Sequence, residues 1–343
     1  MKALKIEAPG TAVIEDVPEP KAKPGEALLR VRRVGLCGSD LNSFRGRNPM
    51  VSFPRIPGHE IAATVIEING EAPELSPGTD VTVLPYTACG QCAACRRGRS
   101  NACQSNQTMG VQRDGALTEY IAVPVEKLYP ARLSLKELCL VEPLTVGFHA
   151  VARARVSEKD TVAIFGCGGV GLGAVAAAAF RGAKTIAVDI DDTKLETAKR
   201  TGANHSIHSQ RQDLNAALAD LTGGMGPDVV IEAIGLPQTF RAAVEVVAFT
   251  GRVVYIGYAK EPVCYETKLF VQKELDIMGT RNALPEDFRS VIEMLKQGRF
   301  PVESAVSAVV PLEEAPKMFE EWDADPNRFT KIMITMDEAS QAR

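Results

Sequence analysis

Apolar and polar positions follow two different patterns along the chain. In the first third, residues 27–34 and 61–68 are short runs rich in β-branched and apolar side chains, and Pro-Gly pairs at residues 24–25 and 77–78 punctuate them. Runs of this length between turn residues predict β-strands. After residue 125, apolar runs alternate with segments of helical spacing, which is typical of an α/β arrangement.

The second pattern predicts a parallel sheet. A helix is expected over residues 134–151, and the continuous apolar run at residues 161–165 suits a strand buried on both faces. Further strands are predicted at residues 184–188, 229–233, 252–256 and 275–279, with helices at residues 192–200, 238–248 and 286–297. These elements complete a doubly wound sheet, and a strand-helix-strand tail is expected to return to the first part of the chain.

A glycine-rich turn follows the run at residues 161–165. It has the spacing Gly-x-Gly-x-x-Gly and opens an alanine-rich helix, and its residues are Gly166, Cys167, Gly168, Gly169, Val170 and Gly171. In this context the glycines let the backbone approach a pyrophosphate at the helix N-terminus. Asp189 ends the next strand, eighteen residues past Gly171, where it can accept hydrogen bonds from a ribose. An acid there repels the extra phosphate of NADP, so we expect NAD. Ligands bind at the carboxyl ends of such strands, which directs attention to Gly235, Gly257 and Thr280.

The stretch between residues 37 and 60 carries candidate metal ligands. It supplies the thiolate of Cys37, the imidazole of His59 and the carboxylate of Glu60, and Cys37 and His59 are both expected at strand ends. These are the ligand types of catalytic zinc, which keeps one position open for water or a substrate oxygen. A buried free cysteine and an unrelated, hydrogen-bonded His-Glu pair would give the same sequence, so the metal interpretation depends on the rest of the chain.

Four cysteines with metal-ligand spacing follow: Cys89, Cys92, Cys95 and Cys103. Four thiolates satisfy a tetrahedral zinc ion completely, which is typical of a structural site. Two disulfides and an iron-sulfur cluster are the alternatives. Disulfides are disfavoured in an intracellular protein, and the usual iron-sulfur spacings differ. We therefore expect a zinc ion that holds this short lobe folded.

Composition narrows the possible partners. The chain has 343 residues, 45% hydrophobic content and a net charge of -4. Acidic and basic residues are mixed along it, so nucleic acid is not expected to bind. The longest apolar candidate, residues 170–180, is too short to span a bilayer, and the first residues lack the features of a signal peptide. We expect a cytoplasmic protein without a membrane segment.

Taken together, these motifs resemble the zinc-dependent medium-chain alcohol dehydrogenases over essentially the full length, including Glu142-Pro143-Leu144. Residues 279–288 are similar to the polyol and sugar-acid branch, and in particular to L-galactonate 5-dehydrogenases. The resemblance implies a Rossmann NAD domain at residues 148–282 and a mostly β, GroES-like catalytic domain at residues 1–147 and 283–343. It also implies a homodimer or homotetramer that oxidises a polyol or sugar acid, with one catalytic and one structural zinc per chain.

The resemblance also implies residue roles. Cys37, His59 and Glu60 would hold the catalytic zinc, with Glu142 as a direct or water-mediated fourth ligand. Ser39 would take the proton from the substrate hydroxyl, and Asp40 would orient His59. Further matching positions would line the NAD cleft: Thr145, Val170, Asp189, Lys194, Gly235, Gly257, Thr280 and Arg281. Contacts with the substrate would come from Ser39, Phe44 and Arg281.

Two departures and several alternatives remain. Relatives often carry a proton-relaying histidine where this chain has Asn42, and a glycine where it has Ala63. Asparagine cannot relay a proton by changing its own protonation state, so water or the ribose hydroxyls would have to complete the path. The alternatives are a neutral-polyol or L-threonine dehydrogenase, a zinc-free reductase of the same fold, and a non-catalytic nucleotide-binding protein.

The other histidines and cysteines are expected to be structural. His149, His205 and His208 lack partners at ligand spacing, and Cys139, Cys167 and Cys264 are expected to be small buried hydrophobes. Arg45 and Arg47 could meet a carboxylate substrate or simply be solvated.

Overall fold

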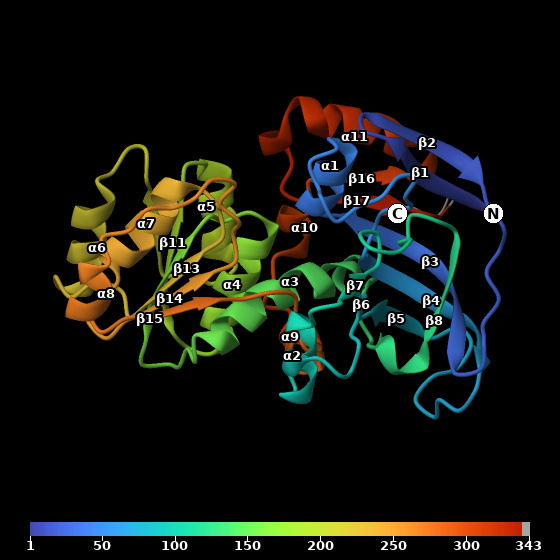
Figure 1. The fold of residues 1–343 in the computed structure, drawn as a ribbon, viewed down its shortest axis with the longest axis horizontal. Coiled ribbons are helices and arrows are strands. Elements are labelled where there is room, and N and C mark those ends of the chain that lie inside the picture. The colour runs from blue at the N-terminus through green and yellow to red at the C-terminus, as the bar shows by residue number, and fades with distance from the viewer. Residues whose placement is uncertain (338–343) are drawn as a thin grey trace. The chain divides into compact units, whose positions relative to one another are not determined.

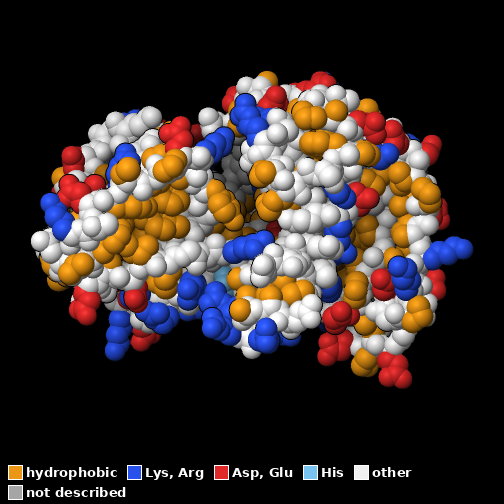
Figure 2. Space-filling view, viewed as in Figure 1, with side chains coloured by type: hydrophobic (Ala, Val, Ile, Leu, Met, Phe, Trp, Pro, Cys, Tyr) orange, Lys and Arg blue, Asp and Glu red, His pale blue; other side chains and the backbone are white. Residues whose placement is uncertain are grey.

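The computed structural model describes residues 1–337 and divides into two compact units. Unit 1 comprises Met1–Glu142 and Val302–Arg343, and unit 2 comprises Pro143–Pro301 (Figure 1). None of the helices in the described part combines the length and the apolar character needed to cross a membrane. Acidic and basic side chains both occur across the face drawn in Figure 2, as the mixed charges of the sequence predict.

Unit 1 is built around one long strand, β3 (Glu26–Leu36). It pairs with β4 (Glu60–Asn69) along its length, with β17 (Ile332–Thr335) at its C-terminal end and with β8 (Tyr120–Pro124) at its N-terminal end, all antiparallel. The seven-stranded sheet is completed by β5 (Asp80–Val83), β9 (Leu128–Pro130) and β16 (Ala308–Pro311). The two strands predicted from the sequence in this region are therefore present, each slightly longer than predicted.

Shorter elements complete unit 1. Two two-stranded antiparallel sheets are formed by β1 (Lys2–Ala8) with β2 (Thr11–Asp16) and by β6 (Tyr86–Thr87) with β7 (Gln107–Thr108). The helices are α1 (Gly38–Phe44), α2 (Ala93–Arg96), α10 (Val302–Ala305), α11 (Ala315–Ala324) and the first part of α3 (Leu135–Arg153).

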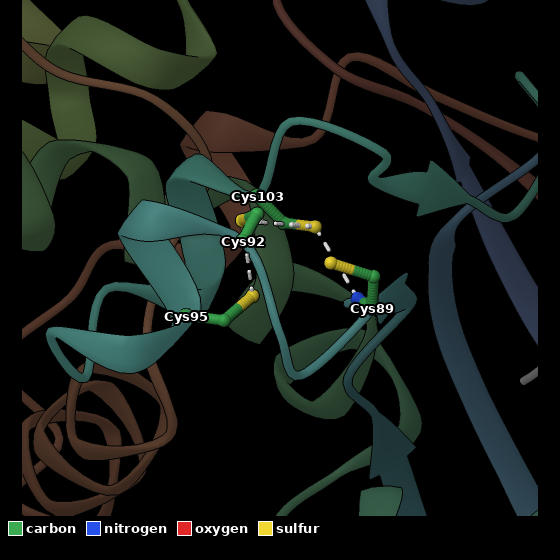
Figure 3. Close-up of side chains that lie close together, drawn as sticks. All are labelled: Cys89, Cys92, Cys95 and Cys103. Atoms are coloured by element: carbon green, nitrogen blue, oxygen red, sulfur yellow. Dashed lines mark hydrogen bonds between the residues drawn. The ribbon is translucent and has the colours of Figure 1, made fainter.

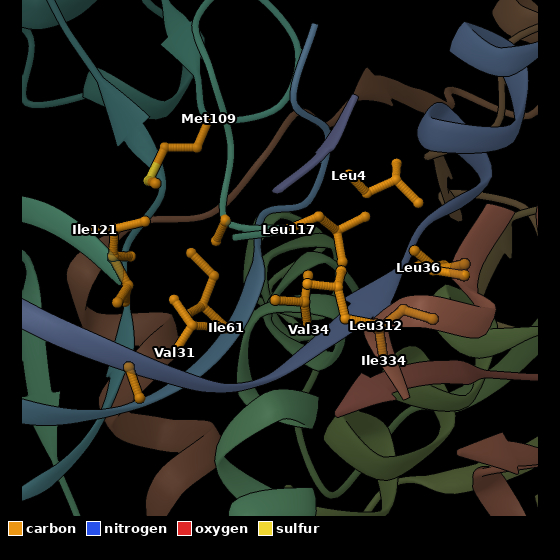
Figure 4. Close-up of a cluster of buried hydrophobic side chains, with 14 of the residues drawn as sticks. Leu4, Val31, Val34, Leu36, Ile61, Met109, Leu117, Ile121, Leu312 and Ile334 are labelled. Carbon is orange, nitrogen blue, oxygen red and sulfur yellow. The ribbon is translucent and has the colours of Figure 1, made fainter. Parts of the chain in front are cut away.

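The core of unit 1 lies between the sheet and the segments that cover it. Figure 4 shows Val31 and Val34 of β3 with Ile61 of β4, and Ile334 of β17 near Leu312. All of these side chains are at most 3% exposed. Because successive strand residues point to opposite faces, a strand that contributes every other side chain to this core directs the rest to the other face.

Unit 2 is a doubly wound α/β domain, as the alternation of the sequence predicts. Its six strands are all parallel, and they lie in the order β12-β11-β10-β13-β14-β15. Their bounds are β10 (Thr161–Phe165), β11 (Lys184–Asp189), β12 (His205–His208), β13 (Val229–Glu232), β14 (Arg252–Tyr255) and β15 (Asp276–Gly279). The order reverses between β10 and β13, and such a switch point is where open α/β sheets bind ligands.

Helices lie on both faces of this sheet (Figure 1). They are α4 (Gly169–Phe180), α5 (Asp192–Arg200), α6 (Leu214–Thr222), α7 (Pro237–Val246), α8 (Lys268–Gln272) and α9 (Pro285–Lys296). The sequence analysis did not predict β12 or α6. Their segment has no continuous apolar run, and within these two elements only Ile207, His208 and Leu218 are buried.

The observed division differs from the expected boundaries after residues 147 and 282. Helix α9 belongs to unit 2, because its Asp287 contacts His149 of α3 at 2.8 Å and its Met294 shares a small cavity with Ala176 and Phe180 of α4. The chain returns to unit 1 only at Val302.

Candidate active site and metal centres

Antiparallel pairing of β3 with β4 brings the first group of candidate ligands together. Cys37 directly follows β3 and His59 directly precedes β4, and Gly35 lies opposite Glu60 in the register. One ligand atom each from Cys37, His59 and Glu60 lies within 4.8 Å of the others. The convergence predicted from the sequence is thus present in the structure.

Asp40 links the two chain segments that carry Cys37 and His59. Its buried carboxylate accepts hydrogen bonds from the backbone N–H groups of Cys37 at 2.9 Å and Gly58 at 3.3 Å. Its Oδ1 atom lies 4.0 Å from Nδ1 of His59. Burial raises the pKa of Asp40, although the adjacent imidazole opposes that shift. Asp40 therefore lies where the sequence analysis expected a partner for His59.

Two polar atoms of this site are buried and have no hydrogen-bond partner among the described residues: Nδ1 of His59 and Oγ of Ser39. Burial lowers the pKa of His59, but Asp40 and Cys37 together raise it well above its usual value. Since buried polar groups are normally hydrogen-bonded, these atoms mark a place where a ligand or ion would complete the contacts.

Glu60 has a partner that the sequence analysis missed. The Nζ atom of Lys331 lies 2.6 and 2.7 Å from the two carboxylate oxygens of Glu60 and donates a third bond to the carbonyl of Leu36 at 3.1 Å. Both side chains are buried, at 7% and 1% exposure. Burial lowers the pKa of Lys331, but Glu60 and Cys37 raise it overall. A carboxylate offers about four lone-pair sites, so Glu60 keeps acceptor capacity for a metal.

Glu142 also has an unexpected neighbour. The hydroxyl of Tyr86, on β6, donates a short hydrogen bond to Oε1 of Glu142, on α3. Burial raises the pKa of Glu142, and burial together with the carboxylate raises that of Tyr86. The charges of His59 and Glu60 also act on the pKa of Glu142, but Glu142 does not belong to the group of three residues whose ligand atoms lie within 4.8 Å of one another.

The four-cysteine lobe forms a second, separate group of ligands. One sulfur atom from each of Cys89, Cys92, Cys95 and Cys103 lies within 4.8 Å of the others (Figure 3). Cys92 Sγ is 3.5 Å from Cys95 Sγ and 4.0 Å from Cys103 Sγ. Backbone N–H groups of Cys95 and Gln104 lower the pKa of Cys92 to about 6, which favours the thiolate. Four converging sulfurs fit a tetrahedral zinc ion.

In unit 2, Asp189 anchors the glycine-rich turn. Its carboxylate accepts hydrogen bonds from the N–H groups of Cys167 and Ile190, both at 2.7 Å, and of Asp191 at 3.1 Å. Gly166 has a positive φ of 91°, and a Cβ atom on Gly171 would lie 1.8 Å from the Gly166 carbonyl oxygen. The turn therefore requires glycine at both positions.

The neighbouring turn depends on Glu232, which the sequence analysis did not single out. This buried residue ends β13, and its Oε1 accepts hydrogen bonds from the N–H groups of Ile234 and Gly235 and from the hydroxyl of Thr239. A Cβ atom on Gly257 would lie 2.4 Å from the nitrogen of Gly235, so the turns after β13 and β14 pack backbone against backbone.

The other predicted cofactor residues lie at scattered places in unit 2. Gly168 precedes α4, while Gly169 and Val170 begin it. Lys194 lies in the first turn of α5, where its N–H group bonds to Asp191, and Thr145 is fully buried in α3. Thr280 directly follows β15, and its Oγ1 is buried without a partner in the described residues. Arg281 is half-buried.

Several other predicted residues are engaged elsewhere. Phe44 is 3% exposed and packs on Phe319 at a centroid distance of 5.4 Å, a core position that does not support a substrate contact. Arg45 pairs with Asp323 of α11, so its charge is already compensated. Cys139 and Cys167 are buried as expected, but Cys264 is exposed.

Comparison with known proteins identifies both halves of the chain. The model of the alcohol dehydrogenase GroES-like domain matches residues 23–133, and that of zinc-binding dehydrogenases matches residues 169–297. An uncharacterised zinc-type alcohol dehydrogenase-like protein of Haemophilus influenzae is 35% identical over 97% of this chain and 98% of its own.

Two further relatives and one solved structure are similar over nearly their whole length. L-galactonate-5-dehydrogenase of Escherichia coli is 31% identical (98% and 99% covered), and sorbitol dehydrogenase of Bacillus subtilis is 34% identical (97% of each covered). The structure of a short-chain alcohol dehydrogenase from E. coli CFT073 with NADH has a TM-score of 0.90 at 27% identity, with 98% and 99% covered.

Proposed function

Because the chain belongs to the family of zinc-dependent medium-chain alcohol dehydrogenases, we propose that it oxidises a secondary alcohol of a polyol or sugar acid and transfers the hydride to NAD. The substrate that we propose first is an L-galactonate-like hexonate. The observation that carries this proposal is the convergence of the partly exposed Cys37 with the buried His59 and Glu60, which together have the donor set of a catalytic zinc site.

The residues of unit 1 fit a zinc ion. Cys37, His59 and Glu60 would hold it, and Glu142 would be the fourth ligand, either directly or through water. Oδ1 of Asp40 lies 4.0 Å from Nδ1 of His59, so the carboxylate would orient the imidazole through its charge and not through a direct hydrogen bond. When bound, zinc supplies a Lewis acid that polarises the substrate hydroxyl.

Ser39 is the proposed proton acceptor. Its buried hydroxyl has no other partner in the described residues, so it is available to a substrate hydroxyl. Asn42 cannot pass that proton on by titrating, and water or the ribose hydroxyls would complete the path to solvent. The four-cysteine lobe would hold the second, structural zinc, because its donors leave no open position.

The cofactor proposal rests on unit 2. Three backbone N–H groups hold the carboxylate of Asp189 at the end of β11, so its negative charge is fixed beside the glycine-rich turn. Such a carboxylate accepts from ribose hydroxyls and repels a 2′-phosphate, which favours NAD over NADP. The turns at Gly235 and Gly257, together with Thr145, Val170, Lys194 and Thr280, would contribute the rest of the site.

Substrate choice is proposed from fewer contacts. Arg281 would bind the hydroxyl or carboxylate groups of the substrate, since guanidinium pairs well with both. We do not propose Arg45 for this role, because its guanidinium already pairs with Asp323. A neutral polyol, as in the sorbitol dehydrogenase relative, is the alternative substrate.

We also propose a cytoplasmic homo-oligomer. A reducing cytosol would keep the four lobe cysteines available to zinc. Strand β15 forms an edge of the six-stranded sheet and exposes Ile277 at 38%, and Val271 of the neighbouring α8 is 82% exposed. Figure 2 shows hydrophobic side chains gathered over this part of unit 2, which would be covered in a dimer or tetramer.

Metal analysis combined with two variants tests the proposal. About two zinc ions per chain are expected from one catalytic and one structural site. Cys37→Ala and His59→Ala should each lower the content to about one and abolish turnover, while NAD affinity stays near that of the wild type. Near wild-type activity in either variant would refute the zinc assignment, and a chain without zinc would favour a zinc-free reductase.

A further inference from the structure

The carboxyl ends of β11 and β12 in unit 2 bring an arginine to the edge of the sheet that carries Asp189. The two strands are parallel neighbours, and Asp189 lies opposite His208 in their register. The N–H group of Ser209 donates to the carbonyl of Asp189 at 3.0 Å. In the same turn, the N–H group of Arg211 donates to the carbonyl of His208 at 3.0 Å. Arg211 therefore follows β12 at the end of the sheet where the proposed cofactor site lies.

Arg211 pairs with Asp192, the first residue of α5. Its Nη1 atom lies 3.0 Å from Oδ1 and 2.9 Å from Oδ2 of Asp192. Oδ1 of Asp192 is also 4.0 Å from Nε2 of His208. The side chains of Arg211 and Asp192 are 65% and 66% exposed, so a ligand from solution can reach both.

An arginine at this place bears on the choice between NAD and NADP. In dinucleotide-binding folds, the acid that ends the second strand accepts from the ribose 2′-hydroxyl, whereas a nearby arginine accommodates the 2′-phosphate of NADP. This chain has both groups. Three acids, Asp189, Asp191 and Asp192, occur in these turns with two cations, Lys194 and Arg211. Without Asp192, the two signs would be equal in number.

Asp192 acts on Arg211 through charge and not by occupying its donors. A guanidinium has five N–H groups, so Arg211 keeps further donors while one nitrogen contacts Asp192. A phosphate that bound these donors would lie close to the carboxylate of Asp192, and the two negative charges would repel each other. At an exposed site, salt weakens this repulsion.

We propose that Asp192 is a specificity-determining residue, which acts with Asp189 to make the adenosine end of the cofactor site reject a 2′-phosphate, because it neutralises Arg211. The inference rests on the proposed function, from which it takes Asp189 as the acceptor of the ribose hydroxyl. Arg211 is then a phosphate ligand that Asp192 keeps out of use. Removing Asp192 makes its charge available to a nucleotide that carries a 2′-phosphate.

The test is calorimetric titration of the purified protein with 2′,5′-ADP and with 5′-AMP, which differ only in the 2′-phosphate and need neither alcohol nor metal. Asp192→Asn should tighten binding of 2′,5′-ADP about tenfold at low salt, the size expected for one hydrogen bond between charged groups. Its affinity for 5′-AMP should stay within about twofold of the wild type. Adding Arg211→Met should remove the gain, and high salt should reduce it.

Glu196→Gln is the matched control. Glu196 also pairs with an exposed arginine of α5, Arg200, at 3.2 Å, with side-chain exposures of 55% and 60%. The variant loses the same charge as Asp192→Asn but leaves Arg211 paired. The ratio of the two affinities should therefore stay as in the wild type.

Three results would overturn the role of Asp192: an unchanged ratio in Asp192→Asn, a gain that survives Arg211→Met, or an equal gain in Glu196→Gln. If the wild type bound neither probe nor NADH, the proposed cofactor site would fail together with this inference. The expected pattern in a protein that oxidises no alcohol would support the inference and refute only the proposed reaction.

Discussion

Replacing Lys331 with methionine should destabilise the metal-free protein by about 3–5 kcal/mol, because breaking a buried ion pair from one side leaves an uncompensated charge. Methionine keeps much of the apolar stem and removes the ammonium group. The pair qualifies as buried, with side-chain exposures of 7% and 1% and two N–O distances of 2.6 and 2.7 Å. Glu60 would then be buried without its cation.

The same substitution should cost less in the zinc-loaded protein. A metal ion beside Glu60 would neutralise the carboxylate charge even when Lys331 is missing. If Glu60 faces the metal, Lys331→Met should therefore lower the free energy of unfolding less with zinc than without it. Urea unfolding with and without zinc measures both. The single tryptophan, Trp322, is buried at 9% in unit 1, so its fluorescence follows the unit that contains the ion pair.

Two variants control this measurement. Lys317→Met removes an exposed lysine on α11, whose side chain is 77% exposed and 3.5 Å from Glu321, and should change stability by no more than about 0.5 kcal/mol. Adding Glu60→Gln to Lys331→Met should recover a large part of the loss, because the buried charge is removed. A cost below about 1 kcal/mol for Lys331→Met in the metal-free protein would refute the reasoning from a buried, unpaired charge.

Three further predictions concern other parts of the molecule. Asp160 accepts a hydrogen bond from the N–H group of Ser157 and forms an ion pair with Arg252. Burial raises the pKa of Asp160, but these two partners lower it overall. The ionised carboxylate therefore stabilises the folded protein above about pH 4, and this contribution is lost as the pH falls through the lowered pKa. Circular dichroism during urea unfolding should therefore show Asp160→Asn less stable than wild type at pH 7, with a difference that shrinks as pH falls below about 4. Asp189→Ala should raise KM for NAD and narrow the preference over NADP, which steady-state kinetics with both cofactors would measure; an unchanged preference would contradict the role of its charge. Cys92→Ser should lower zinc content by about one ion per chain and lower the melting temperature, and a variant with full zinc content would contradict the four-sulfur site.

Local patterns predicted the elements that carry the chemistry. The apolar run of β10 stands between polar residues and a glycine turn, and its position in the centre of a parallel sheet follows from burial on both faces. Cys37 and His59 were placed at strand ends because turn residues and β-branched runs mark those ends. Their convergence then required only that β3 and β4 be antiparallel neighbours.

Contacts between distant segments could not be predicted in the same way. Glu60 and Lys331 are 271 positions apart, and Tyr86 and Glu142 are 56 apart, so no spacing rule connects them. A lysine directly before an apolar strand is also an ordinary feature of exposed strand ends. Only the pairing of β17 with β3 brings the ammonium group to Glu60.

The domain boundary illustrates the same limit. The amphipathic pattern of α9 indicates that Phe288, Val291 and Leu295 are buried, but it does not indicate which core they enter. Asp287 and its contact with His149 assign the helix to unit 2. For Phe44, the sequence indicated a position near the site, while its packing on Phe319 decides that the ring belongs to the core.

The most direct test is NADH formation by the purified, zinc-loaded protein with NAD across L-galactonate, other hexonates, sorbitol, galactitol and L-threonine, repeated after metal removal and zinc restoration. We predict reduction of NAD with a hexonate or polyol, its loss with the metal and its return with zinc. A preference for one hexonate would support the sugar-acid substrate. If no compound gave NADH, or if the metal-free protein kept full activity, the assignment as a zinc-dependent polyol or sugar-acid dehydrogenase would be contradicted.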